Sequence, residues 1–328
     1  MPRTLIARSE SWPLSRPFRI SRGVKTAADV VVVELHEAGK SGAGEAVPYA
    51  RYGETPEQVL AAIEALRPAL EAGMTRAALQ AALPAGAARN AIDCALWDLE
   101  AQLTRRSVAD LTGIAAPAEI VTAVTISLDE PQAMAKAAAG VAAAPLLKVK
   151  VDAANPLSQL RAVRAAAPTA RLMVDPNESW SPALLRQVSP DLAALRVDLI
   201  EQPVAAADDA ALKQIASPVP LCADESAHTS ADLECVAQTY QAVNIKLDKA
   251  GGLTEALAMR AQAEAMGLTL MIGCMVCTSL AIAPAFILAG GARFADLDGP
   301  WWLARDRDNG IRFRDGRLSA PSLWGIPR

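Results

Sequence analysis

The spacing of hydrophobic and polar residues divides the chain into two parts. Residues 20–46 are predicted to form antiparallel strands, because "VVVVELHEAGKSGAGEA" gives a strand, a glycine-rich turn and a shorter strand. Helical patterns follow: Thr55 and Pro56 form a helix-start signal, and residues 89–103 repeat apolar residues at helical spacing. The first third of the chain is therefore predicted to be an α+β unit.

After residue 118, short apolar strands alternate with helical patterns. The predicted strands begin near residues 122, 146, 171, 197, 219, 242, 268 and 293, at intervals of 22 to 26 residues. This rhythm predicts a parallel (β/α)8 TIM-like barrel; a doubly wound open sheet is the alternative, which the even spacing disfavours. We therefore expect an α+β capping domain at residues 1–117, the barrel at 118–300, and a C-terminal segment at 301–328 that returns to the capping domain.

Composition argues against several classes of function. The first twenty residues lack the apolar core of a signal peptide, and no stretch is both long and uncharged enough to span a bilayer. Five cysteines, an odd number, indicate reduced thiols and a cytoplasmic protein. A net charge of −4 without a basic block gives no support for nucleic-acid or membrane partners, and leaves a homo-oligomer open. Two histidines are too few for a His-rich zinc site and leave little for a Ser-His-Asp triad.

Charged residues lie at the predicted C-terminal ends of the barrel strands, where the active sites of such barrels are found. They are Lys148 and Lys150 on the second strand, Asp175, Glu201 and Asp224 on the third to fifth, Lys246 on the sixth, and Asp296 and Asp298 on the eighth. Three carboxylates at successive strand ends would repel one another without a cation, and hard oxygen ligands suit Mg²⁺. A helix cap or an ion pair would explain any single one of these acids, so it is their succession that predicts a Mg²⁺ site.

The lysines predict proton transfer. Strand alternation sends Lys148 and Lys150 to one face, and strands two and six of an eight-stranded barrel face each other across its mouth. Lys150 and Lys246 would then stand on opposite sides of a substrate, where one removes a proton next to a carboxylate and the other returns it. This needs at least one neutral lysine, whose pKa Mg²⁺ and neighbouring ammonium groups would lower. The same alternation predicts that Lys249 points away from the mouth.

The motifs KVK, DPN, EQP, ADES and NIK, on five successive strands, resemble those of the enolase superfamily in its muconate-lactonizing-enzyme subgroup. The resemblance covers nearly the whole chain, including the capping domain. It implies that Mg²⁺ is held by Asp175, Glu201 and Asp224, that Lys150 and Lys246 are the acid/base pair, that Lys148 lies beside the substrate carboxylate, and that Asn177 and Glu225 support the ligands.

Within that subgroup, "ADLDGP" resembles the Asp-x-Asp signature of the dipeptide epimerases, above all those that act on L-Ala-D/L-Glu. Asp296 and Asp298 would hold the free α-ammonium of a dipeptide; the alternative is that one of them caps the following turn. In the capping-domain loop "ISRGVKTA", Lys25 stands where those epimerases have an arginine, with Arg22 nearby. A lysine lacks the bidentate fork of arginine, which weakens the expected preference for Glu.

Other residues have smaller roles in this prediction. Thr125 and Cys274 are expected to line the pocket, and the C-x-x-C of Cys274 and Cys277 lacks the context of a redox or zinc site. We expect a Mg²⁺-dependent isomerase that epimerises a small-molecule dipeptide. The alternatives are a cycloisomerase, an o-succinylbenzoate synthase or an N-acylamino acid racemase of the same subgroup, a ligand-binding barrel without catalysis, and a Schiff-base aldolase using Lys246.

Overall fold

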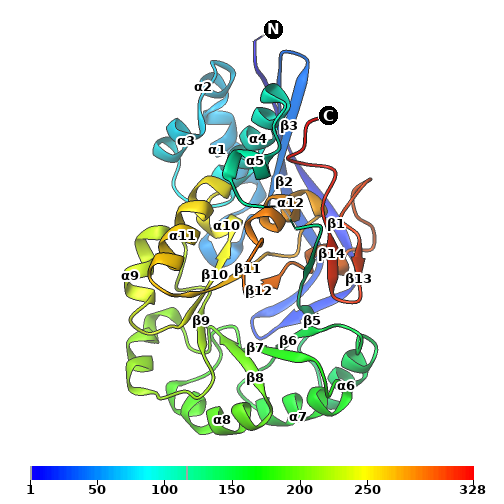
Figure 1. The fold of residues 1–328 in the computed structure, drawn as a ribbon, viewed down its shortest axis with the longest axis vertical. Coiled ribbons are helices and arrows are strands. Elements are labelled where there is room, and N and C mark those ends of the chain that lie inside the picture. Colours follow the sequence, from blue (N-terminus) through cyan, green and yellow to red (C-terminus); the bar gives the residue numbers. More distant parts are fainter. Residues whose placement is uncertain (1, 116) are drawn as a thin grey trace.

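The computed structural model describes residues 2–115 and 117–328, and the chain forms two adjoining parts (Figure 1). Met1, where the predicted capping domain begins, and Ala116, near its predicted end, lie outside the described residues. The N-terminal part has a three-stranded sheet and helices: β1 (Thr4–Ile20), β2 (Gly23–Glu37), β3 (Lys40–Ala46), η1 (Ala50–Tyr52), α1 (Pro56–Ala65), α2 (Arg67–Glu71), α3 (Arg76–Ala82), α4 (Ala87–Thr104) and α5 (Val108–Thr112). The predicted α+β unit is confirmed.

The N-terminal sheet is built on the long hairpin of β1 and β2, which pair antiparallel along almost their whole length. The tip of this hairpin reaches the second part of the molecule. There Ser21 Oγ donates a hydrogen bond of 3.2 Å to the backbone carbonyl of Pro176. A turn of the capping domain is thereby fixed next to the strand ends of the barrel.

Helix α4 packs closely on β3 because two glycines of that strand leave room for its backbone. A Cβ atom at Gly42 would lie 2.1 Å from the backbone nitrogen of Leu99, and one at Gly44 would lie 2.1 Å from the carbonyl oxygen of Ala91. Any larger residue would therefore push the helix off the sheet. Gly42, which the sequence pattern assigned to the glycine-rich turn, thus lies within β3 and serves the packing of α4.

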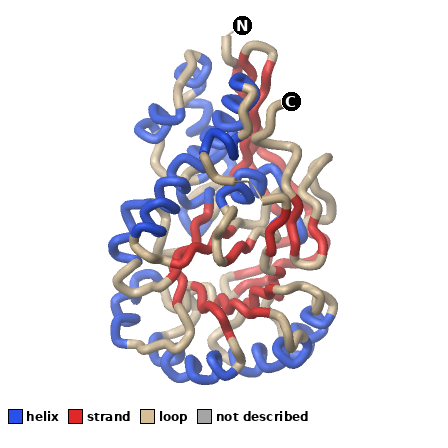
Figure 2. Tube along the Cα trace, viewed as in Figure 1, coloured by secondary structure: helices blue, strands red, loops and turns tan. Residues whose placement is uncertain are grey.

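The second part is a parallel barrel surrounded by helices (Figure 2). Its strands are β5 (Val124–Ile126), β6 (Leu146–Lys150), β7 (Arg171–Asp175), β8 (Val197–Glu201), β9 (Leu221–Ala223), β10 (Ala242–Lys246), β11 (Thr269–Gly273) and β12 (Phe294–Asp296). The helices between and after them are α6 (Pro131–Ala139), α7 (Pro156–Ala166), α8 (Pro182–Ala194), η2 (Ala206–Gln214), η3 (Ser230–Asp232), α9 (Leu233–Val236), α10 (Leu247–Ala250), α11 (Leu253–Ala265), α12 (Ser279–Leu288) and η4 (Gly299–Trp302). The strands pair in chain order, and the backbone N–H of Ala123 donates to the carbonyl of Ala295 at 2.8 Å, which joins the first strand region to the last. The predicted (β/α)8 barrel is confirmed.

The interior of the barrel is layered. One side chain from each strand region forms an apolar cluster: Ala123, Leu146, Met173, Leu199, Cys222, Ala242, Met271 and Phe294. Since side chains alternate along a strand, the residues two places further on also point inward. They are Thr125, Lys148, Asp175, Glu201, Asp224, Asn244, Gly273 and Asp296. A polar layer therefore lies directly above an apolar one, toward the C-terminal ends of the strands.

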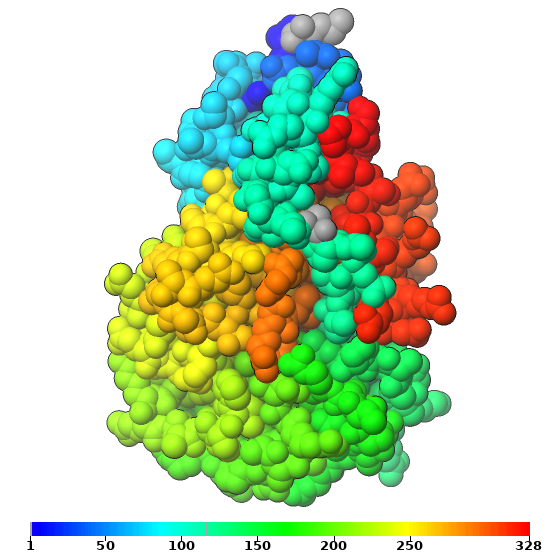
Figure 3. All heavy atoms as spheres, viewed as in Figure 1, coloured from blue at the N-terminus to red at the C-terminus, as the bar shows by residue number. Residues whose placement is uncertain are grey.

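The C-terminal segment returns to the N-terminal part, as expected (Figure 3). Its strands β13 (Phe313–Arg314) and β14 (Arg317–Ser319) form a small sheet with β4 (Glu119–Val121). Beyond that sheet, Trp324 Nε1 donates to the carbonyl of Ala43 at 2.8 Å, and the N–H of Gly325 donates to Asp98 Oδ1 at 2.8 Å. The domain boundaries at 117 and 300 stay a prediction. Within the described residues, none of the helices combines the length and the apolar character needed to cross a bilayer.

Candidate active site

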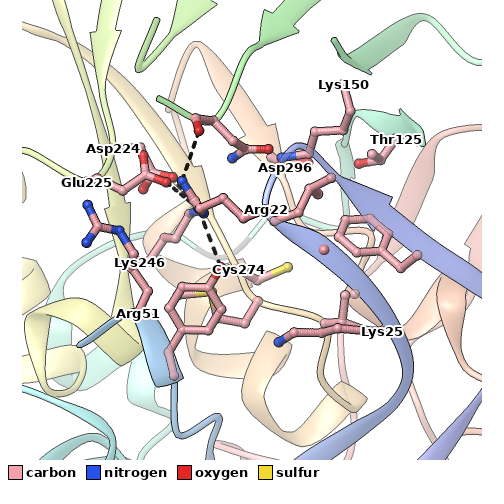
Figure 4. A pocket seen from close by; sticks show the side chains of 18 of the residues that line it. Arg22, Lys25, Arg51, Thr125, Lys150, Asp224, Glu225, Lys246, Cys274 and Asp296 are labelled. Carbon is pink, nitrogen blue, oxygen red and sulfur yellow. Dashed lines mark hydrogen bonds and ion pairs between the residues drawn. The ribbon is translucent and has the colours of Figure 1, made fainter. Parts of the chain in front are cut away.

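A cavity of about 480 Å³ lies between the C-terminal ends of the barrel strands and two loops of the capping domain (Figure 4). The capping domain contributes Phe18, Ile20, Arg22, Gly23, Val24, Lys25, Tyr49, Ala50, Arg51 and Tyr52. The barrel contributes Thr125, Lys148, Lys150, Asn177, Asp224, Glu225, Lys246, Cys274, Met275, Val276, Asp296, Asp298 and Gly299. Every predicted site residue except Asp175 and Glu201 thus lines one cavity, and those two are buried and paired with Lys148.

The three predicted metal ligands are buried carboxylates on adjacent strand ends. Lys148 Nζ lies 3.0 Å from Asp175 Oδ2 and 2.6 Å from Glu201 Oε2, and Lys148 is only 2% exposed. Burial, and then the neighbouring Asp175 carboxylate, raise the pKa of Glu201 to about 8. Burial also pushes the pKa of Asp175 upward, but the ammonium groups of Lys150 and Lys148 outweigh it and hold that pKa below its ordinary value. The cluster therefore requires positive charge.

The chemistry of this cluster fits a divalent metal ion. Glu201 Oε1 accepts a hydrogen bond of 2.8 Å from Asn244 Nδ2, and Glu201 Oε2 forms the 2.6 Å ion pair with Lys148. Among residues 2–115 and 117–328, no three His, Cys, Asp or Glu side chains converge closely enough to hold a metal, since lysines lie between the carboxylates. Three buried carboxylates are nevertheless hard oxygen donors, the kind of ligand that Mg²⁺ prefers.

The two predicted acid/base lysines come from strands that face each other. Lys150 on β6 contacts Asp175 Oδ2 at 2.5 Å, and Lys246 on β10 contacts Asp224 Oδ2 at 2.7 Å. Figure 4 shows them on different sides of the cavity. Burial lowers the pKa of Lys246, but the adjacent Asp224 carboxylate outweighs burial and holds the pKa well above its ordinary value. In this arrangement the ammonium form is therefore favoured, opposite to the lowering expected beside Mg²⁺.

Asp296 and Asp298 both point into the cavity from the end of β12. Asp298 Oδ2 accepts hydrogen bonds from the N–H of Thr125 at 2.7 Å and from Trp302 Nε1 at 3.3 Å, and it makes no cap bond to the following turn. Asp296 Oδ2 pairs with Lys148 at 2.7 Å, while Asp296 Oδ1 is buried and forms no hydrogen bond with the described residues. Burial, and then Asp296, raise the pKa of Asp298 to about 6. The alternative of a turn cap is therefore not observed, and an acceptor is left for a cationic group.

The capping-domain cations differ in what they contact. Arg22 pairs with Glu225 at 2.6 Å and with Glu178 at 3.0 Å, and Arg51 pairs with Glu178 at 2.9 Å. Lys25 lies over the ring of Tyr49, 4.9 Å from its centre, and forms no ion pair with any described residue. Of these three cations, Lys25 is the one available to an acidic substrate group.

Some residues that organise the cavity escaped the sequence analysis. Glu178 follows the DPN motif and forms ion pairs with Arg22 and Arg51. Asn244 donates a hydrogen bond to Glu201; it lies two positions before Lys246, so strand alternation could have indicated its inward side chain. Of the two expected supporting residues, Asn177 donates its backbone N–H to Asp175 Oδ1 at 2.8 Å. The other, Glu225, pairs with Arg22 of the capping domain at 2.6 Å.

The prediction for Lys249 is wrong. Lys249 is buried, at 2% exposure, and its Nζ donates to Asp224 Oδ1 at 2.7 Å. Strand alternation does not extend to it, because β10 ends at Lys246 and the chain turns at once into α10. The C-x-x-C pair carries no disulfide: Cys274 is partly exposed in the cavity, Cys277 is buried, and both are free thiols.

Sequence families match both parts of this architecture. Residues 2–113 match the family described as mandelate racemase / muconate lactonizing enzyme, N-terminal domain, and residues 132–326 match the enolase C-terminal domain-like family. The chain therefore belongs to the enolase superfamily, with the domains of its mandelate racemase and muconate lactonizing enzyme branch. The predicted family is confirmed.

Characterised relatives narrow the comparison within that superfamily. The chain is 50% identical over 318 residues to the L-Ala-D/L-Glu epimerase of Escherichia coli strain K12, covering 96% of this chain and 99% of that protein. It is 43% identical over 300 residues to the N-acetyl-D-glutamate racemase of a Pseudoalteromonas species, covering 90% of this chain and 95% of that protein.

Solved structures agree in fold and carry ligands. An enolase family member from Agrobacterium tumefaciens with homology to dipeptide epimerases, solved with bound sodium and L-Ala-L-Glu, is 48% identical with a TM-score of 0.97, covering 99% of this chain and 100% of that one. A dipeptide epimerase from Enterococcus faecalis, complexed with Mg and L-Leu-L-Tyr, is 29% identical with a TM-score of 0.92, covering 99% of both chains.

Proposed function

We propose that this protein is a Mg²⁺-dependent dipeptide epimerase that inverts the α-carbon of the C-terminal residue, with L-Ala-D/L-Glu from murein peptides as its substrate. The observation that carries this proposal is the pair Lys150 and Lys246, which enter one cavity from strands four apart in the barrel. Two amines on opposite sides of one carbon can exchange its proton with inversion. The relatives at 43 to 50% identity support the same reaction class.

Asp175, Glu201 and Asp224 are the residues that would hold Mg²⁺, one ion per subunit. When bound there, a divalent cation stabilises the negative charge that develops on the substrate carboxylate as the α-proton leaves. The burial of these three carboxylates on adjacent strand ends and their hard oxygen donors support this assignment. Lys148, between these carboxylates and the cavity, supplies a further positive charge beside the substrate carboxylate.

The two lysines divide the proton transfer between them. In one direction Lys150, as the neutral amine, takes the α-proton and Lys246, as the ammonium, donates a proton to the opposite side; the reverse direction exchanges these roles. Each lysine is held by a carboxylate of the cluster, Lys150 by Asp175 and Lys246 by Asp224. Burial and the Lys148 ammonium both push the pKa of Lys246 downward, but the Asp224 carboxylate outweighs them and holds that pKa above its ordinary value.

The Asp296 and Asp298 pair favours a substrate with a free amine. Two adjacent buried carboxylates attract the α-ammonium of a dipeptide, and Asp296 Oδ1 has no other partner. The second candidate is an N-acylamino acid racemase, favoured by the similarity to an N-acetyl-D-glutamate racemase. An N-acyl group carries no positive charge, so it would offer no cationic partner to the buried Asp296 Oδ1.

The side chain of the inverted residue would meet Lys25. Lys25 lines the cavity without an ion pair to any described residue, whereas Arg22 is held by Glu225 and Glu178. A single ammonium attracts a glutamate side chain without the bidentate fit of arginine. We therefore propose a preference for Glu that tolerates other residues. Free thiols at all five cysteine positions support the cytoplasm as the location of this activity.

Deuterium uptake tests the proposal. The protein with Mg²⁺ is incubated in D₂O with a dipeptide library, with L-Ala-L-Glu and L-Ala-D-Glu as first members and N-acetylglutamate as a separate arm. Mass spectrometry should show that the C-terminal residue of the Ala-Glu peptides gains one α-deuterium. Chromatographic separation should show that the opposite epimer is formed at the same time. Exchange of N-acetylglutamate alone would favour the second candidate, and no exchange with any dipeptide would contradict the proposal.

A further inference from the structure

Lys249 lies where two barrel strands separate. β9 and β10 pair through Cys222 with Ala242 and through Ala223 with Val243, and their pairing ends there. The next residues are Asp224 and Asn244. The Lys249 ammonium donates a hydrogen bond to the backbone carbonyl of each, at 3.1 Å for Asn244, and so bridges the two strands beyond their last paired residues.

The same ammonium also binds the side chain of Asp224, at 2.7 Å from Oδ1. An ammonium group has three donors, and these three acceptors use all of them. Lys249 is 2% exposed. Among the described residues, Lys246 lines the cavity and Lys249 does not. A buried ammonium is costly unless it is fully paired, so this lysine is committed to the protein and cannot reach a substrate.

The two carboxylate oxygens of Asp224 bind different lysines. Oδ1 binds Lys249, and Oδ2 binds Lys246 at 2.7 Å. Because Oδ1 is tied to an ammonium that is itself anchored on two backbone carbonyls, the carboxylate cannot rotate freely. Oδ2 is therefore presented to the side of the cavity where Lys246 lies. Asn244, the other anchor, donates its side-chain amide to Glu201 at 2.8 Å, so the bridge extends to a second carboxylate of the cluster.

We propose that Lys249 is a positioning residue for one half of the epimerisation: it fixes Asp224, and through Asp224 it sets the place from which Lys246 acts. This inference rests on the proposed function. Lys150 pairs with Asp175 and forms neither a hydrogen bond nor an ion pair with Asp224, so its side of the reaction does not depend on Lys249 in the same way. Loss of the Lys249 bridge should therefore slow proton transfer by Lys246 more than proton transfer by Lys150.

The test compares the two epimers in the same enzyme. Wild type, Lys150→Ala and Lys246→Ala first establish which of L-Ala-L-Glu and L-Ala-D-Glu presents its α-proton to Lys246. In Lys249→Met, the rate of α-deuterium exchange with that epimer, divided by the rate with the other, should fall about tenfold. This ratio is independent of the amount of folded enzyme. Lys249→Arg should restore most of the ratio, and Lys213→Met, which removes an exposed lysine bound to Gln238, should leave it unchanged.

A crystal structure of Lys249→Met provides a readout besides activity. We expect the Asp224 carboxylate to turn away from its wild-type orientation. An unchanged exchange ratio, or an Asp224 carboxylate that keeps its place without Lys249, would overturn the inference. If wild type exchanges no dipeptide, the proposed function fails instead, and the orientation of Asp224 in the two structures alone decides the role of Lys249.

Discussion

The carboxylate of Asp298 accepts a hydrogen bond of 2.7 Å from the backbone N–H of Thr125, which links the end of the last barrel strand to the first. This bond fixes one acid of the Asp-x-Asp pair by the closure of the barrel itself. The other acid, Asp296, keeps an oxygen without a partner. The proposed ammonium site thus combines a rigid acid with one that has free acceptor capacity.

Asp296→Asn should weaken the recognition of a free amine. Loss of one charged hydrogen bond costs about 1.5–3 kcal/mol, so kcat/KM for L-Ala-L-Glu should fall roughly 10- to 150-fold. The informative quantity is the ratio of kcat/KM for this dipeptide to that for its N-acetyl derivative, because any effect on Lys148 is shared by both substrates. In Asp296→Asn, this ratio of kcat/KM values should fall by most of the roughly 10- to 150-fold loss. Asp315→Asn, at an exposed position, is the matched control, and an unchanged ratio in Asp296→Asn would remove the ammonium site from the proposal.

Glu178→Gln should loosen the contact between capping domain and barrel. Glu178 is the carboxylate that pairs with both Arg22 and Arg51 beside the cavity. Its loss should raise KM by about 3- to 10-fold, corresponding to roughly 1 kcal/mol, and lower kcat less. Asp191→Asn, which breaks the exposed ion pair with Arg161, should change neither parameter. Steady-state kinetics decide this, and a kcat effect larger than the KM effect would contradict a role in closing the cavity.

The pH dependence of stability should carry the signature of Asp248. This carboxyl is buried below the capping domain, where Val47 N–H and Asn90 Nδ2 both donate to Oδ1, and burial raises its pKa from 3.8 to about 7. Because folding raises this pKa, the native state binds more protons between those values, and stability falls as pH rises from about 4 to 7. Above pH 7 the contribution is constant.

Asp248→Asn keeps the Oδ1 acceptor and removes the titration. Relative to wild type, the variant should gain about 2.5 kcal/mol of stability between pH 5 and pH 8. Urea unfolding at the two pH values measures the difference, with Asp315→Asn as the exposed control. A variant whose stability parallels that of wild type across this range would show that Asp248 does not titrate there.

The sequence was sufficient for the features that follow from periodicity. The strand rhythm predicted the barrel, and the positions of Lys148, Asp175 and Glu201 at strand ends predicted that they gather at its mouth; the structure places them in one polar layer. The expectation of a dipeptide epimerase agrees with the relatives at 50 and 48% identity. These predictions depend only on repeating geometry and on motifs with fixed spacing.

The features that were missed depend on where a regular element stops. Lys249 was placed outward by an alternation that had already ended at Lys246. Glu178 has a positive φ of 66° in the loop after β7, and its pairing with Arg22 joins residues 156 positions apart. Neither a helical turn after a strand nor a contact across domains leaves a periodic signal in the chain.

The most direct test of the account is single-epimer exchange in the two lysine variants. Lys150→Ala and Lys246→Ala, loaded with Mg²⁺, are each given pure L-Ala-L-Glu and pure L-Ala-D-Glu in D₂O, and α-deuterium and inversion are measured separately. We predict that neither variant inverts either epimer, and that each still exchanges the α-proton of one epimer, a different one in each variant. Exchange retained for the same epimer in both variants, or inversion by either of them, would contradict lysines acting from opposite sides.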